Sequence, residues 1–296
     1  MASYLDARAA RGTWLIRMED LDTPRMVPGA DQVIINQLAT LGMHADQAIV
    51  YQSQRLDVYQ EAFDALSAQG LIYPCGCTRQ EIADSLCAAQ TQVSLTDATA
   101  QADQIAQTTQ TAQVIPATQT FTPSSKPYPG TCRNGLAPHK TARAWRLKVP
   151  HQIIELIDRW CGQQTQNVHD EVGDFILRRA DGIWSYQLAV VVDDAAQDVT
   201  HIVRGQDLLN STARQRLLAQ VLGFTPPQTL HVPVLYDERG LKYSKQNHAP
   251  SLNLAHPLEC LTAAWLSLGF APLSVRDMKS FWNDATLVWQ NRFFNP

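Results

Sequence analysis

Residues 17–25 have the sequence RMEDLDTPR and directly follow a short apolar run, TWLIR, at residues 13–17. We expect the apolar run to form a strand and the charged stretch to form a loop, because Pro24 and Pro28 interrupt regular structure. Ligands of open α/β sheets bind at the carboxyl ends of the strands. A carboxylate such as Glu19 would therefore face the ligand crevice. The alternative is a charged turn on the surface.

The segments around this loop predict an alternation of helices and strands. Apolar side chains recur at helical spacing over residues 1–10, 31–41 and 53–69, and a glycine follows each segment. Ser53 is the expected N-cap of the third helix. Residues 71–73 resume as a strand. This order predicts an α/β domain with a parallel sheet.

The second half of the chain predicts more strands. We expect strands over residues 142–149, 153–160, 174–179, 184–193, 199–204 and 229–235. The run at 184–193, WSYQLAVVVD, is predicted to be a buried strand after a turn at Asp181 and Gly182. A helix is predicted over residues 205–222, and the last 45 residues are predicted to be mostly helical. Residues 88–125 are rich in Gln, Thr and Ala, which predicts a low-complexity surface loop.

Composition restricts the possible classes of protein. With 296 residues, of which 45% are hydrophobic and 18% charged, the chain can bury the core of one elaborated domain or two modest ones. No apolar run is long enough to span a bilayer and no signal peptide pattern is present, so we expect a cytoplasmic protein, a monomer that does not bind membranes. The net charge of −4 restricts nucleic-acid contacts to a local basic patch. The candidate strip contains Arg133, His139, Lys140, Arg143, Arg146 and Lys148, although these residues would equally suit a solvated strand face.

Three further groups carry chemistry. Lys242 and Lys245 bracket Ser244 in the stretch LKYSKQ, and mobile ammonium groups of this kind neutralise phosphate charge. The alternative is a solvated lysine loop. Arg204, in the stretch HIVRGQDL, offers a planar fork for a carboxylate, and Tyr186 offers a hydroxyl. Asp193 and Asp194 follow the predicted buried strand, where they would simply cap the next turn.

Together these stretches resemble the class I glutamyl-tRNA synthetase superfamily. The resemblance lies in R-x-E-D-L-D-x-P-R at residues 17–25, in Y-x-L-A-V-V-V-D-D followed by V-x-R-G-x-D-L, and in the lysine–serine–lysine loop. It implies a Rossmann-type catalytic domain that activates L-glutamate with ATP, accompanied by Mg²⁺. By this resemblance Glu19, Tyr186 and Arg204 bind glutamate, and Glu19 pairs with its α-ammonium. Lys242 and Lys245 are catalytic, and Lys245 binds ATP.

The short C-terminal region resembles one branch of the superfamily, the glutamyl-queuosine tRNA(Asp) synthetases. The chain ends 51 residues after Lys245, and residues 242–249 match the K-x-S-K-Q-N-H-A pattern of that branch. The resemblance implies activation of glutamate without tRNA and transfer to queuosine at the wobble position of tRNA(Asp). The alternatives are a fragment of an ordinary glutamyl-tRNA synthetase, and a catalytically dead module that binds zinc and RNA.

The same branch carries a zinc subdomain, whose pattern is matched by Cys75-Gly76-Cys77 and by the stretch YPGTC at residues 128–132. By this resemblance Cys75, Cys77, Cys132 and Tyr128 bind Zn²⁺. Zinc prefers four tetrahedral ligands, and a tyrosine ligand is unusual, so His139 in place of Tyr128 and a closed turn without metal stay open. Cys87, Cys161 and Cys260 stand alone and are interpreted as packing residues.

The resemblance also implies a domain organisation. Residues 1–70 would form the first part of the catalytic domain, 71–180 the inserted zinc subdomain with its loop at 88–125, 181–235 the second part, and 236–296 the lysine loop and a helical region. The family begins with a strand and an H-x-G-S element, and Met1 falls after both. We therefore expect a first strand to be missing, through a misassigned start codon or a fragment, and expect the product as written to be poorly soluble and unable to activate glutamate.

Overall fold

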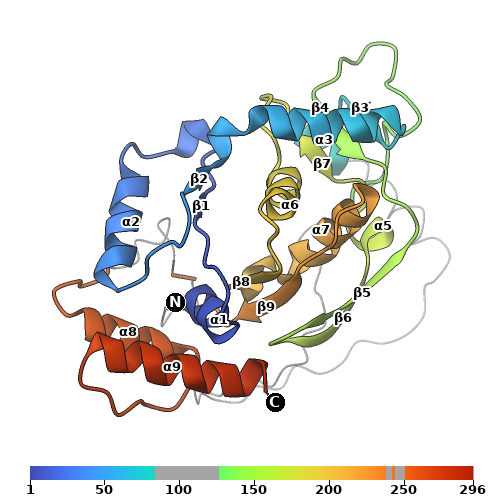
Figure 1. Ribbon diagram of the computed structural model, residues 1–296. Helices are drawn as coiled ribbons and strands as arrows, with labels where there is room; N and C mark the ends of the chain where they lie inside the picture. Colours follow the sequence, from blue (N-terminus) through green and yellow to red (C-terminus); the bar gives the residue numbers. More distant parts are fainter. Residues whose placement is uncertain (84–126, 238–241, 244–250, 296) are drawn as a thin grey trace, which may run out of the picture.

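The computed structural model describes residues 1–83, 127–237, 242–243 and 251–295. Lys245 and the loop expected at residues 88–125 lie outside the described residues. The helices are α1 (Ala2–Ala9), α2 (Ala30–Thr40), α3 (Leu56–Ala68), α5 (Val168–Glu171), α6 (Tyr186–Ala196), α7 (Leu209–Val221), α8 (Pro257–Ser267) and α9 (Met278–Phe293). The strands are β1 (Arg17–Met18), β2 (Val50–Tyr51), β3 (Ile72–Cys75), β4 (Ala144–Leu147), β5 (Ile153–Asp158), β6 (Gly162–Asn167), β7 (Ile176–Arg178), β8 (His201–Gly205) and β9 (Gln228–Val232) (Figure 1).

The described strands form three sheets. β1 and β2 pair in parallel, and β9 pairs in parallel with both β8 and β5. β6 joins antiparallel to β5, which gives the order β6-β5-β9-β8. β3, β4 and β7 form an antiparallel sheet. The expected α/β character is confirmed, but the sheets are mixed rather than wholly parallel.

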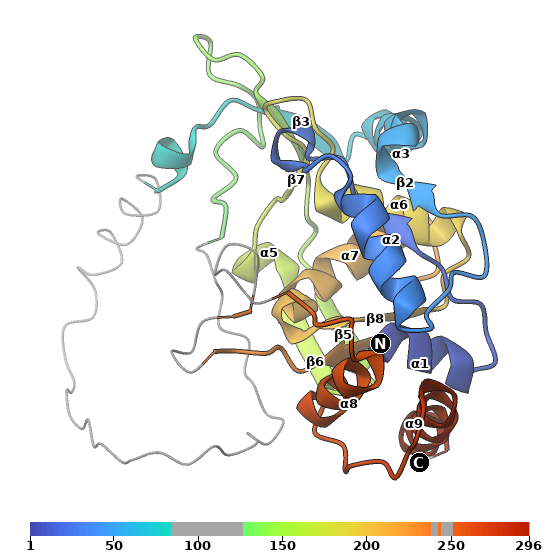
Figure 2. The same cartoon turned by 90° about the vertical axis from the view of Figure 1, so that its left-hand side faces the viewer.

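Two apolar cores hold these sheets. One core packs α3, α6 and α7 together, and Leu188 and Ala189 of α6 are completely buried in it. The second is aromatic and lies where α8 and α9 pack near α1, with Phe281, Trp265 and Trp289 buried. The indole Nε1 of Trp289 donates to Asp6 Oδ1 of α1 at 2.8 Å. The antiparallel sheet lies at the end of the molecule opposite α8 and α9 (Figures 1 and 2).

The strand predicted over residues 184–193 is wrong, because this segment is most of helix α6. The Ser185 side chain accepts a hydrogen bond from Leu188 N at 3.3 Å and so caps the helix. Residues 188–194 are all buried, including Asp193 and Asp194, so this stretch has no exposed polar face to mark it as a surface helix. The run of valines favours a strand locally, and packing between α3 and α7 overrides that preference.

A smaller prediction also fails, and one strand was not predicted at all. Ser53 does not cap α3, whose N-cap is Arg55. Instead the Ser53 backbone N and Oγ donate to Asp20 at 2.8 and 2.5 Å, which ties the loop after β1 to the segment before α3. Strand β6 was not expected, because its sequence GQQTQN contains no large apolar side chain.

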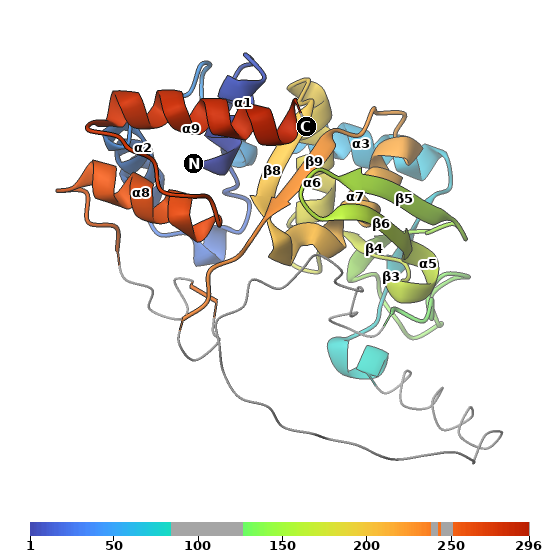
Figure 3. The same cartoon turned by 90° about the horizontal axis from the view of Figure 1, so that it is seen from below.

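A cavity of about 680 Å³ lies between the sheet of β1 and β2 and the four-stranded sheet. Ile16 and Arg17 line one side and Ile202 and Val203 of β8 line the other. Among the described strands, no ladder joins β1 to β8. Figure 3 shows α1 and α9 on one side of this region, with β5 and β6 beyond β9. Within the described residues, no helix is both long and apolar enough to cross a membrane.

Candidate functional site

Arg204 lies at the centre of a polar cluster near the end of strand β8. It belongs to β8, and its guanidinium donates to Gln215 Oε1 at 2.7 Å and to Thr212 Oγ1 at 2.9 Å. Both acceptors lie on α7, the helix that follows β8. The guanidinium also donates to the Tyr186 hydroxyl at 3.3 Å, from the first turn of α6. The fold therefore brings Arg204 and Tyr186 together, as the sequence predicts.

Glu19 follows β1 and lines the cavity between the sheets. Its side chain is 46% exposed, so a ligand can reach it. Partial burial is the main cause that raises the pKa of Glu19 above its ordinary 4.5, while Arg17 and Arg204 oppose the shift. Arg204 and Glu19 also both act on the ionisation of Tyr186. The three residues expected to bind one ligand thus lie within electrostatic reach of one another.

Asp193 and Asp194 do not cap a turn; both are buried in helix α6. Asp193 is completely buried and accepts from Gln52 Nε2 at 2.8 Å, Arg55 Nε at 2.6 Å and the Tyr59 hydroxyl at 2.8 Å. It therefore anchors α3 to α6.

Asp194 binds Arg17 instead, at 2.8 Å from Nη2. Burial raises the pKa of Asp194, and Arg17 opposes that shift. The pair fixes β1, and with it the loop that carries Glu19. The motif residues Arg17, Asp193 and Asp194 thus position the site, a role that the sequence analysis missed.

Lys242 is the described member of the expected lysine pair. It is exposed, forms an isolated bridge with Tyr236 and pairs with Asp207 after β8. The bridge and the ion pair place the start of the lysine loop beside the Arg204 strand. Ser244 and Lys245 lie outside the described residues.

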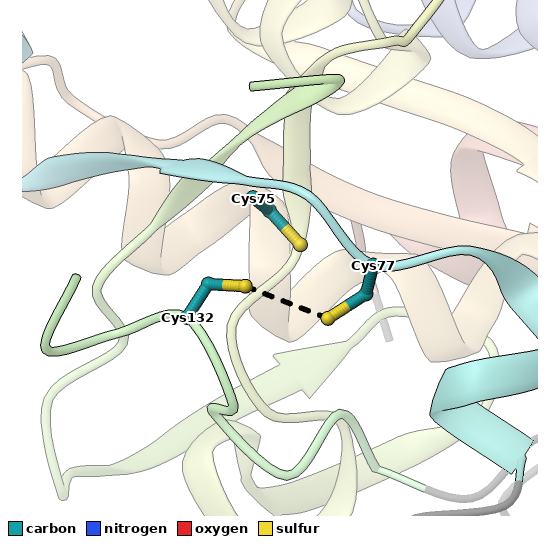
Figure 4. Close-up of side chains that lie close together, drawn as sticks. All are labelled: Cys75, Cys77 and Cys132. Carbon is teal, nitrogen blue, oxygen red and sulfur yellow. Dashed lines mark hydrogen bonds between the residues drawn. The ribbon is translucent and has the colours of Figure 1, made fainter. Parts of the chain in front are cut away.

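A separate cluster gathers three thiols and a phenol beside the antiparallel sheet. The sulfur atoms of Cys75, Cys77 and Cys132 all lie within 4.8 Å of one another, and Cys77 Sγ is 3.5 Å from Cys132 Sγ (Figure 4). The Tyr128 hydroxyl lies 3.4 Å from Cys75 Sγ and 3.6 Å from Cys77 Sγ. All three cysteines are free thiols. The four side chains that the sequence predicts as ligands therefore converge.

The donor set fits a tetrahedral metal ion. Thiolates about 2.3 Å from a zinc ion stand about 3.8 Å apart at the corners of a tetrahedron, close to the 3.5 Å between Cys77 Sγ and Cys132 Sγ. Hydrogen bonds from Tyr128 and Arg146 lower the pKa of Cys75 although burial alone would raise it. Burial raises the pKa of Cys77 to about 11. His139 is exposed and lies outside the cluster, whereas the Tyr128 hydroxyl lies against two of the thiols.

Backbone contacts without room for a side chain build this cluster. Tyr128 pairs with Gly173, where φ is +73° and an added Cβ would stand 2.3 Å from the Tyr128 carbonyl oxygen. At Gly76, between the two cysteines, an added Cβ would stand 2.9 Å from the Thr141 carbonyl oxygen. Glycine is therefore required at both positions.

The basic strip is only partly available for phosphate contacts. Arg146 is buried, and its guanidinium lies 3.7 Å from the centre of the Tyr128 ring. The prediction that Arg146 contacts phosphate is therefore wrong. Arg133 pairs with the buried Asp174, and Lys140 pairs with Glu81 at 2.7 Å. His139 and Arg143 are exposed. Positive charge beside the thiols offsets the negative charge of a thiolate cluster.

Comparisons with known proteins identify the family. The model of the catalytic domain of class I tRNA synthetases (E and Q) matches residues 1–121 and 130–259. The glutamyl-Q tRNA(Asp) synthetase of Bordetella bronchiseptica is 51% identical over 294 residues, which are 99% of this chain and 83% of that protein. The proteins of the same name from Janthinobacterium sp. (strain Marseille) and Burkholderia orbicola are 47% and 48% identical, again over 99% of this chain and over 90% of each relative.

Solved structures agree on the fold. Glutamate-tRNA synthetase from Elizabethkingia anophelis superimposes with a TM-score of 0.62 at 24% identity, over 83% of this chain and 48% of that one. A glutamate tRNA ligase from Elizabethkingia meningosepticum, in complex with its amino acid, gives a TM-score of 0.60 at 23% identity, over 82% of this chain and 47% of that one. The chain spans about half the length of these two enzymes. From the family match, the close relatives and the shared fold together, we conclude that this chain belongs to the class I tRNA synthetases (E and Q) and is a ligase that uses ATP.

Proposed function

We propose that the protein activates L-glutamate with ATP in the absence of tRNA and transfers the glutamate to queuosine at the wobble position of tRNA(Asp). The observation that supports the proposal is that Arg204 donates to the Tyr186 hydroxyl and acts electrostatically on Glu19, which lines the cavity. The close relatives named glutamyl-Q tRNA(Asp) synthetase support the choice of tRNA.

Charge complementarity supports glutamate as the amino acid. The ionised Glu19 pairs with the α-ammonium, and Arg204 with Tyr186 receives a carboxylate. Arginine has five N–H donors, and four of its hydrogen bonds here go to His231, Tyr186, Gln215 and Thr212. Among the described residues one Nη2–H has no acceptor, so it and the Tyr186 hydroxyl both point to recognition of an anionic side chain.

Activation is an attack on the α-phosphorus of ATP. A carboxylate oxygen of glutamate forms the new bond to phosphorus, the bond to the β-phosphate breaks, and pyrophosphate leaves. Lys242 and Lys245 neutralise the charge that builds on pyrophosphate, together with Mg²⁺. The pairing of Lys242 with Asp207 supports this role, because it holds the ammonium near the strand that carries Arg204.

We also propose that Cys75, Cys77, Cys132 and Tyr128 hold Zn²⁺ within an inserted subdomain at residues 71–180. The spacing of the four donors and the buried Arg146 beside them support the proposal. Bound zinc supplies a structural cross-link between β3 and the segment that contains Tyr128 and Cys132. Because both segments belong to the same small sheet region, the cross-link stabilises that region rather than the glutamate pocket.

Amino-acid-dependent exchange of pyrophosphate into ATP tests the activation step. We expect the protein, expressed together with any residues that its gene encodes upstream of Met1, to support exchange with L-glutamate without tRNA, and to give background rates with L-aspartate and L-glutamine. Exchange by the 296-residue product alone would contradict the expectation that this product is inactive. Absence of exchange with glutamate alone, and its appearance on addition of tRNA(Glu), would favour an ordinary glutamyl-tRNA synthetase. Absence of exchange under both conditions, with retained binding of zinc and RNA, would favour the catalytically dead module.

A further inference from the structure

A buried carboxylate and imidazole lie directly behind Arg204. Asp158 ends β5 and is 1% exposed, and His231 in β9 is 0% exposed. His231 Nδ1 lies 2.6 Å from Asp158 Oδ2, and Arg204 Nε lies 2.9 Å from His231 Nε2. His231 is the cross-strand partner of Arg204 in the parallel pair of β9 and β8. The three side chains therefore form a line across three neighbouring strands.

The two partners fix the protonation of His231. An ionised carboxylate only accepts hydrogen bonds, so Nδ1 of the imidazole carries the proton that points to Asp158. A guanidinium only donates, so Nε2 must offer its lone pair to Arg204. His231 is therefore the neutral Nδ1–H tautomer. A proton on Nε2 would face the N–H of Arg204, so the hydrogen bond between Arg204 and His231 requires this tautomer.

Asp158 is itself held by the backbone. Its Oδ1 accepts from the N–H groups of Trp160, Cys161 and His231 at 3.1, 2.9 and 3.1 Å. The carboxylate therefore cannot rotate without the loss of several hydrogen bonds in a buried site. Because Asp158 holds His231, and His231 accepts from Arg204 Nε, these hydrogen bonds also restrict the plane of the guanidinium.

The stability of the fold alone does not require the buried pair of Asp158 and His231. A well-packed apolar pair at such a site is often as stable as a buried polar pair, whereas functional groups need supporting side chains that hold their geometry. We propose that Asp158 and His231 are positioning residues that orient Arg204 to receive the carboxylate of the amino-acid substrate. The inference rests on the proposed function of Arg204 as the glutamate-binding residue. Asp158 and His231 touch neither the substrate nor the reacting atoms.

Three variants separate positioning from general stability. His231→Leu removes the acceptor for Arg204 while it keeps an apolar group in the core. His231→Gln keeps an amide oxygen that can accept from Arg204 Nε. Leu230→Ala, at the neighbouring and equally buried position of β9, destabilises the strand without removing a contact of Arg204.

Steady-state exchange kinetics at saturating ATP and at saturating glutamate give the first readout. We expect His231→Leu to raise the KM for glutamate by about 10-fold or more, while the KM for ATP changes less than about 2-fold. The reason is that the variant displaces Arg204, and in the proposal only glutamate binds to Arg204. His231→Gln should recover most of the glutamate KM. Leu230→Ala should lower the melting temperature and leave both KM values near those of the wild type. Equal shifts of both KM values in His231→Leu, or the His231→Leu pattern in Leu230→Ala, would overturn the proposal.

A second readout does not depend on activity. Long-range proton–nitrogen NMR correlations report the tautomer of His231, identified by its absence from the His231→Gln spectrum, and the Nε–H signal of Arg204 is identified by Arg204→Lys. We expect the Nδ1–H tautomer, and a shifted Arg204 signal in His231→Leu. An Nε2–H tautomer or an unchanged Arg204 signal would overturn the proposal. Absence of exchange in the wild type with the expected spectra would instead remove the proposed function, and with it the substrate assigned to Arg204.

Discussion

At the scale of single residues, Arg204 can be predicted from the sequence, but the residues that support it cannot. Its planar guanidinium identifies it as a candidate for a carboxylate, and the resemblance to the synthetase family adds Tyr186. His231 and Thr212, which also contact Arg204, carry no local signal because they come from a different strand and helix. Such contacts depend on the order of the strands, which a single sequence does not specify. Supporting residues are therefore harder to predict than the residues they support.

Replacement of Arg204 by lysine tests its planar recognition of a carboxylate. A lysine keeps the charge but loses the fork, and a charged hydrogen-bonded contact is worth about 1.5–3 kcal/mol. We expect kcat/KM for glutamate in pyrophosphate exchange to fall by about 10- to 100-fold. Arg276→Lys, at an exposed position, is the matched control and should leave exchange unchanged. Wild-type kinetics in Arg204→Lys would contradict the role of Arg204.

The lowered pKa of Asp158 predicts that the stability of the protein depends on pH. Burial alone would raise its pKa, but the bond from His231 and the backbone N–H groups lower it from 3.8 to about 2. A carboxyl whose folded pKa is lowered stabilises the fold above the unfolded pKa and loses that contribution as pH falls toward the folded value. We expect Asp158→Asn to cost at least about 2 kcal/mol at pH 7 and clearly less at pH 3 in urea unfolding. The exposed Asp284→Asn should show no such difference, and a cost for Asp158→Asn that does not change with pH would contradict this reasoning.

At the scale of elements, local patterns locate most segments. They misjudge α6 and β6, and they place the first strand too early, since the strand expected at residues 13–17 forms at Arg17–Met18. The helices that end before Gly42 and Gly70 are predicted well, because each glycine adopts a positive φ, of 77° and 68°, that terminates the helix. Helix α6 is mistaken for a strand because burial on all sides removes its periodicity. Strand β6 is missed because its pairing with β5, rather than its side chains, creates it.

Substitution of Gly173 tests whether its close contact with Tyr128 is needed to form the metal cluster. An alanine there meets the Tyr128 carbonyl oxygen at 2.3 Å and must also adopt a positive φ. We expect Gly173→Ala to displace Tyr128 and weaken zinc binding by at least about 10-fold, as a misplaced ligand shell does. Gly223→Ala has a similar φ of +75° but open space around its Cβ, so it should cost about 1–2 kcal/mol of stability without loss of zinc. Equal zinc affinity in both variants, measured by competition with a chromogenic chelator, would show that the contact is unimportant.

Removal of the metal tests the role of the cysteines. We expect the wild type to contain one zinc per chain by elemental analysis, and Cys132→Ser to lose it. Loss of zinc should lower the melting temperature and increase hydrogen exchange in β3, β4 and β7 more than in β8 and β9, because the cluster lies at the antiparallel sheet of β3, β4 and β7. Cys260→Ser, outside the cluster, should retain the metal. A full complement of zinc in Cys132→Ser would contradict the assignment of ligands.

At the scale of the whole molecule, residues far apart in the chain make the site. Glu19 follows β1, Tyr186 begins α6 and Arg204 lies in β8, and the buried Asp193 and Asp194 of α6 tie these parts to α3 and β1. The aromatic core of α1, α8 and α9 supports β8 from the other side. The sequence predicts that the last residues are helical, but not that they pack near α1, since this contact joins the two ends of the chain. The family resemblance, rather than periodicity, made the candidate pocket predictable.

The central claim concerns the site on tRNA that receives glutamate. The direct measurement is the transfer of radiolabelled L-glutamate to three substrates: tRNA(Asp) with queuosine, tRNA(Asp) without it, and queuosine-containing tRNA(Asp) from which the 3′-terminal adenosine has been removed. Ordinary aminoacylation requires that adenosine, whereas transfer to the wobble base does not. We predict equal labelling of the two queuosine-containing tRNAs and no labelling of the tRNA(Asp) that lacks queuosine. Labelling that requires the 3′-terminal adenosine, or that favours tRNA(Glu), would contradict the account.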